Sequence, residues 1–200
     1  MGMNIALVSV LSGFLGVVVG VVMPISREWL ARSRDARYLA IRIVCILDRY
    51  VEDCASTAID SGEEDTEGVN IARVHAPPPP AYPSDVNWKS IDHTMMYKLL
   101  ALPAAADRAA NYLEGVSEND GPPYSEWFEV RSHQYSLLGL QAHKLTETLR
   151  KEYEIPEIPD RSWDPVSHLR DELKQIEDRQ KQRSVAWDEI LPTLPTPPTT

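Results

Sequence analysis

Side chains that could bind a metal ion are few in this 200-residue chain, and their spacing does not suit a metal site. The histidines are His75, His93, His133, His143 and His168. No two of them are four residues apart, the spacing that places two imidazoles on one helix face. Glu129 and His133 have that spacing, as do Asp164 and His168, which is typical of exposed ion pairs on helices. A di-iron bundle would instead need Glu-x-x-His twice. We therefore expect no metal ion and no cofactor.

Nucleophilic side chains form no catalytic motif that we recognise. The chain contains no G-x-S-x-G, G-x-G-x-x-G or G-x-x-x-x-G-K-[ST] sequence. Cys45 and Cys54 lie in one predicted helix, where nine residues separate their backbones by about 13 Å, beyond the roughly 7 Å that a disulfide allows. We interpret both as small packing residues of a protein from a reducing compartment. A catalytic site could still be assembled from distant residues, so an enzyme remains an alternative.

The charge distribution argues against binding to nucleic acid. The formal net charge is −10, with 20 basic and 30 acidic side chains. Residues 1–60 contain six of each, so residues 61–200, with 14 basic and 24 acidic side chains, carry the whole net charge. An acidic domain gains nothing from the counterions that a phosphate backbone releases. We therefore expect no nucleic-acid partner.

Aromatic and proline residues gather near the predicted turns. The aromatic ones are Tyr82, Trp88, Tyr97, Tyr124, Trp127, Phe128 and Trp163. We interpret them as core and corner packing, and the alternative is an exposed partner-binding groove.

Residues 75–83 hold five prolines and predict an extended polyproline II segment. A stiff linker is the favoured interpretation, and a PxxP ligand for an aromatic groove is the alternative.

The first 25 residues predict a transmembrane anchor. Ile5 to Ile25 includes no charged residue, and as a helix it would span about 31 Å, close to the roughly 30 Å of a hydrocarbon core. Basic residues follow this segment and none precedes it. They are Arg27, Arg32, Arg34, Arg37 and Arg42, which we interpret as a topology signal that also faces lipid headgroups. The expected location is the plasma or inner membrane, with the N-terminus outside and the C-terminal domain in the cytoplasm.

Small residues recur every four positions in the same segment. Ser12, Gly16 and Gly20 share one helix face, which would let two helix backbones approach closely. We therefore expect a weak homodimer formed mainly through this face.

The rest of the chain predicts a small all-α domain. Its parts are a juxtamembrane helix at 26–60, an acidic and Pro-rich linker at 61–89, a helical core at 90–154, a C-terminal helix at 155–188 and a disordered Pro/Thr tail at 189–200. Helical spacing of apolar residues supports these assignments. The clearest examples are Leu39, Ile43, Leu47, Tyr50 and Cys54, and then Tyr135, Leu138, Ala142, Leu145 and Leu149. We predict helix N-caps at Ser26, at Ser90 or Asp92, and at Ser125, and a helix end at Pro103.

Together these features predict a fold of one transmembrane helix and about four to five further helices. The expected function is a membrane-tethered helical interaction or structural module, non-enzymatic, with an unknown protein partner. One alternative is a membrane-bound enzyme with a site built from distant residues. Another is a small membrane-perturbing or lysis-related factor, in which the apolar segment itself acts.

Overall fold

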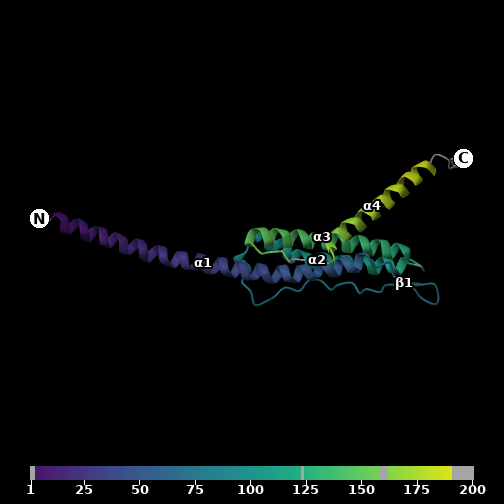
Figure 1. The fold of residues 1–200 in the computed structure, drawn as a ribbon, viewed down its shortest axis with the longest axis horizontal. Helices are drawn as coiled ribbons and strands as arrows, with labels where there is room; N and C mark the ends of the chain where they lie inside the picture. Colours follow the sequence, from purple (N-terminus) through teal and green to yellow (C-terminus); the bar gives the residue numbers. More distant parts are fainter. Residues whose placement is uncertain (1–2, 123, 158–161, 191–200) are drawn as a thin grey trace, which may run out of the picture.

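A computed structural model of the chain shows four long helices (Figure 1). It describes residues 3–122, 124–157 and 162–190, with side chains from residue 29 to residue 185 inside those ranges. The helices are α1 (Met3–Ala58), α2 (His93–Asn119), α3 (Ser125–Tyr153) and α4 (Pro165–Ile190). Between α1 and α2 lie the short strands β1 (Glu63–Glu64) and β2 (Asn70–Ile71) and the 3₁₀ helix η1 (Trp88–Ser90). The mostly helical character of the predicted fold is confirmed.

The transmembrane helix is the part of the predicted fold class that is wrong. Within the residues described, no helix combines the length and the apolar character needed to cross a bilayer. The described side chains of α1 begin at Trp29, and charged residues such as Arg32 and Asp35 recur from there on, which is costly in hydrocarbon. The predicted membrane localisation, with the N-terminus outside and a cytoplasmic domain, is corrected with it. The side chains of Ile5 to Ile25, on which that prediction depended, are not among those described.

The helix α1 is longer than predicted, because it continues without a break through Pro24 and Ser26. No new helix therefore begins at Ser26. Its C-terminal half lies inside the bundle, whereas its N-terminal half extends away from it (Figure 1). Buried apolar residues cover a broad face of the packed half, which shows that more than one element covers it. These residues are Ala36, Leu39, Ala40, Ile43, Val44, Leu47, Tyr50, Val51, Cys54, Ala55 and Ala58.

The helix α3 is the principal partner of α1, and α2 and α4 also pack against α3. The predicted apolar face of α3 is confirmed, since Tyr135, Leu138, Ala142, Leu145 and Leu149 are all buried. At Gly139 three helices come close together. A Cβ atom there would lie 2.7 Å from Leu169 of α4 and 3.0 Å from Cys54 of α1, so only glycine fits without a shift.

The helix α2 was predicted to end at Pro103 and instead continues through it to Asn119. Proline removes one backbone hydrogen bond from a helix interior. Here Leu99, Leu102 and Ala106 are buried on both sides of the proline, so tertiary packing holds the helix together. The predicted N-cap at Asp92 is confirmed, because its carboxylate accepts hydrogen bonds from the backbone of Thr94 and Met95.

The segment between α1 and α2 returns along the outside of the bundle (Figure 1). It starts with a small antiparallel hairpin in which Glu63 pairs with Ile71, an element that the sequence analysis missed. Pro77 and Pro80 are then buried against the helices, and Tyr82 packs edge-on against Trp88 at 5.7 Å. The buried prolines agree with the stiff-linker interpretation. Of the predicted tail, residues 191–200 lie outside the described part of the chain.

Candidate functional site

The most elaborate polar site in the described structure surrounds a buried arginine, Arg131 of α3. Only 2% of Arg131 is exposed to solvent. Its Nη1 donates hydrogen bonds to the Thr57 carbonyl oxygen at 3.1 Å and to the Asp60 carboxylate at 3.2 Å. Its Nη2 donates to the Val74 carbonyl oxygen at 2.5 Å, and the guanidinium lies 5.4 Å from the centre of the Trp127 ring. Three distant segments of the chain therefore meet on one side chain.

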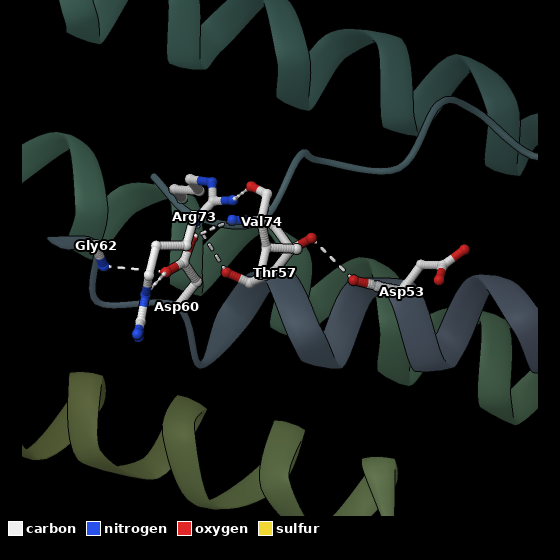
Figure 2. Close-up of polar contacts among 7 residues, drawn as sticks. Asp53, Thr57, Asp60, Gly62, Arg73 and Val74 are labelled. Atoms are coloured by element: carbon white, nitrogen blue, oxygen red, sulfur yellow. Dashed lines mark hydrogen bonds and ion pairs between the residues drawn. The ribbon is translucent and has the colours of Figure 1, made fainter. Parts of the chain in front are cut away.

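Asp60 connects the same segments from the other side (Figure 2). Its carboxylate accepts hydrogen bonds from the backbone N–H groups of Gly62 at 3.1 Å and Val74 at 2.9 Å. Arg73, whose side chain is largely exposed, forms an ion pair with Asp60 at 3.6 Å. Gly62 adopts a φ of +80°, which favours glycine and lets the chain turn back directly after α1. We call Thr57, Asp60, Gly62, Arg73, Val74 and Arg131 the Arg131 cluster.

The electrostatics of the Arg131 cluster favour a fixed ion pair. Burial alone would raise the pKa of Asp60, but the Val74 and Gly62 N–H groups and the Arg131 guanidinium outweigh it and lower that pKa. Burial lowers the pKa of Arg131 despite the attraction of Asp60. An arginine pKa starts far above neutrality, so both groups stay charged at pH 7. Such a pair offers no proton for acid–base catalysis near neutral pH.

A second arginine–aspartate pair lies farther along the bundle. Arg150 of α3 donates two hydrogen bonds to Asp48 of α1, at 3.0 and 2.6 Å, in a bidentate arrangement. The pair borders an open cleft of about 980 Å³ between α3 and the start of α4. His143, Glu147, Asp164 and Arg170 also line this cleft. Its walls therefore carry charges of both signs and do not select a ligand of one charge.

The buried tyrosine and cysteine side chains are unsuited to nucleophilic chemistry. Burial raises the pKa values of Tyr50 and Tyr82, and it raises the pKa of Cys54 far above neutrality. A thiol in this state is a packing residue, as predicted for Cys54. Cys45 is exposed, so the prediction of a packing role is wrong for that residue. Both cysteines are free, in agreement with the predicted absence of a disulfide between them.

The predicted basic residues have diverse surroundings. Arg42 forms an ion pair with Asp85 at 3.0 Å and lies over the Tyr38 ring, while Arg32 donates a hydrogen bond to the Lys89 carbonyl oxygen. Arg34 and Arg37 are exposed on α1. The remaining predicted site residues have no described side chains; they are Ser12, Gly16, Gly20 and Arg27. No described contact tests the roles predicted for these residues, and those in membrane topology and transmembrane self-association presupposed the span that is corrected above.

The predicted carboxylate–histidine pairs are replaced by other contacts. Glu129 forms ion pairs with Arg179 and Arg183 of α4. His168 stacks on Trp163, with the ring centres 5.7 Å apart. The described i, i+4 pair of this type is instead His143 with Glu147, at 3.4 Å. Among the residues that the structure describes, no group of three or more His, Cys, Asp or Glu side chains is arranged to hold a metal ion.

Sequence reasoning missed both arginine–aspartate pairs. Arg131 and Asp60 are 71 positions apart, and Arg150 and Asp48 are 102 apart. One signal was available, because Arg131 falls on the same helical face as Tyr135, Leu138 and Ala142, where an unpaired charge would be costly. That position implies a buried partner without identifying it.

Comparison with known proteins adds no assignment, since no protein-family model, curated protein or solved structure matches the chain.

Proposed function

We propose that the chain is a non-enzymatic helical interaction and structural module. The observation that carries this proposal is that the most deeply buried charges, Asp60 and Arg131, bind parts of the same chain. Their contacts reach the end of α1, the hairpin segment and α3. A buried pair with hydrogen bonds to several segments restricts the relative positions of the elements that it joins. The bundle is therefore suited to present its surfaces and helical ends in a defined arrangement.

The projecting part of α4 is the first surface that such a module would offer. Every described residue from Glu177 to Val185 is exposed, whereas Leu169 and Ile176 earlier in the helix are buried. Arg179 and Arg183 hold the start of this arm against Glu129 of α3. Residues 177–184 are all polar, and Val185 after them is an exposed apolar side chain. Such a stretch gains little from its own packing, so binding to a partner is a physical reason for it to persist.

A catalytic role has weaker support. The cleft beside Arg150 is open, and its arginine already makes a bidentate pair with Asp48. The high pKa of Cys54 opposes a thiolate nucleophile. Among the side chains that the structure describes, no specific contact favours the enzyme or lysis-related alternatives over the interaction module.

The test is truncation of the α4 arm. A chain that ends after Asp178 removes the arm and keeps the buried Leu169 and Ile176. We expect the thermal midpoint to fall by no more than about 4 °C, since only exposed residues are lost. Proteins that co-purify with the tagged full chain should be absent from the truncated chain. A matched control carries Lys98→Glu on α2, far along the sequence from the arm. Capture that is unchanged by the truncation, or turnover of a substrate by the purified chain, would overturn the proposal.

A further inference from the structure

Two exposed surfaces at opposite ends of the bundle are complementary in charge and in apolar character. The first is on α1, where that helix enters the bundle. Arg34, Arg37, Tyr38 and Ile41 are exposed there at spacings of three and four residues, so they share one helix face. Tyr38 is 58% exposed and Ile41 41%. We call these four residues the basic face.

The basic face has charges that the rest of the described chain leaves unpaired. Arg42, just beyond it, is paired with Asp85, and Arg49 is paired with Asp53. Arg34 and Arg37 form no ion pair with a described carboxylate. The exposed Asp35 lies beside Arg34, so this face and its border carry two positive charges and one negative charge on a chain whose net charge is −10.

The second surface is the hairpin at the other end of α1 (Figure 1). Glu63 and Glu64 are exposed in β1, and Ile71 of β2 is 54% exposed. Glu63 and Ile71 are directly paired across the strands, so their side chains lie on the same side of the hairpin. Ile59, at the end of α1, is a further exposed apolar side chain. Glu64 pairs with Asn70 and lies on the opposite side of the same strand. We call Ile59, Glu63 and Ile71, together with Glu64 on the reverse side, the acidic face.

We propose that the acidic face of one copy of this chain docks on the basic face of a second copy. Each surface combines apolar side chains with charges, and the charges have opposite signs. A symmetric pairing of two basic faces, or of two acidic faces, would place like charges together and is disfavoured. The contact is therefore head to tail and can repeat from copy to copy. This inference rests on the proposed interaction function and identifies one partner for it.

The small size of both faces determines the strength of the contact. A stable interface buries roughly 800 Å² on each partner, and four side chains on each face provide only part of that area. Association should thus be weak, dependent on protein concentration and sensitive to salt.

Charge reversal in the purified full-length chain tests the proposal by sedimentation velocity. Arg34→Glu with Arg37→Glu makes both faces acidic, and Glu63→Arg with Glu64→Arg makes both basic. The self-association constant of each variant alone should fall by a factor of about ten or more relative to the original chain. An equimolar mixture of the two should associate again, because each reversed face then meets a face of opposite charge.

A matched control reverses two exposed charges on α2, Lys98→Glu with Arg108→Glu, and should leave association unchanged. Circular dichroism must show that all variants keep the helical fold. Ile71→Ser should also weaken association without any change of charge. Self-association that persists in both reversed variants, or a mixture that does not associate, would overturn the head-to-tail contact. Loss of the α4 arm should not affect this association, so the two proposals can fail separately.

Discussion

Two arginine–aspartate pairs connect α3 to α1 or to the segment directly after α1, and their surroundings differ. The pair of Arg131 and Asp60 is almost completely buried and includes backbone groups from the hairpin segment. The pair of Arg150 and Asp48 has shorter hydrogen bonds in a bidentate arrangement, but it borders an open cleft. The hydrogen-bond distances alone would rank the Arg150–Asp48 pair as the stronger.

The comparison shows that the surroundings of an ion pair determine what its loss costs. Removal of one partner from a buried pair leaves a charge that water cannot reach. At an open cleft, water can replace much of the lost interaction. The buried pair also fixes the path of the chain after α1, since Asp60 accepts hydrogen bonds from both Gly62 and Val74. The Arg150–Asp48 pair joins two helices, and Arg150 Nε also donates a long hydrogen bond to the Pro156 carbonyl oxygen after α3, at 3.4 Å.

The largest effect should follow Arg131→Met, which leaves Asp60 charged and buried. We expect the free energy of unfolding to fall by about 3–5 kcal/mol. Urea denaturation of the full chain, followed by circular dichroism, measures this change. Addition of Asp60→Asn should recover part of the loss, because the buried charge is removed and the amide oxygen can still accept from one of the two N–H groups, of Gly62 or Val74. A loss below about 1 kcal/mol for the single variant would contradict the importance of the buried pair.

A smaller effect is expected for Arg150→Met in the same assay. The remaining Asp48 lies beside the open cleft, so the free energy of unfolding should fall by about 1–2 kcal/mol. The cost should also shrink at 0.5 M salt, because salt screens the more accessible pair in the original chain. The cost of Arg131→Met should change little with salt. An equal salt dependence of the two variants would remove the distinction between the pairs.

The smallest expected effect is the dependence of stability on pH that Asp60 contributes. The pKa of Asp60 is lower in the folded chain than its ordinary value, so folding favours its ionised form. Its contribution to stability is therefore complete above the unfolded pKa of about 4, and it is lost as the pH falls through the lower folded pKa. The midpoint of urea denaturation, compared between the original chain and Asp60→Asn from pH 6 to pH 2.5, measures this contribution. The advantage of the original chain should decline only below about pH 4. A difference that stays constant over this range would show that Asp60 is not stabilised as a carboxylate.

Helical elements could be predicted from the sequence where their signals are local. The apolar spacing of Leu39, Ile43 and Leu47 and the N-cap at Asp92 depend on neighbours within a few residues. The errors arose where tertiary contacts override such signals. Pro103 was expected to end a helix, and burial of α2 against α3 keeps that helix continuous. Ser125 was expected to be an N-cap, but Tyr124 occupies that position with a φ of +61°, and Asp120 accepts the hydrogen bond from the Trp127 backbone instead.

The membrane prediction was a different kind of error. It used the length and uncharged character of Ile5 to Ile25, whose side chains the structure does not describe, and among the described residues no helix is long and apolar enough to cross a bilayer. The same basic residues that were interpreted as a topology signal include Arg34 and Arg37, which form part of the basic face in the structure. Their spacing was visible in the sequence, but the acidic face at the other end of the bundle was not.

The sequence by itself determined the helical class, the main apolar faces and the acidic character of the chain beyond residue 60, because each depends on residue type and short-range spacing. Only the tertiary structure decided which charges are buried together. The Arg131 cluster gathers residues from the end of α1, the hairpin segment and α3, and no local pattern specifies that meeting. The physical reason is that a helix face shows where burial is needed, while the identity of the buried partner depends on how the faces pack.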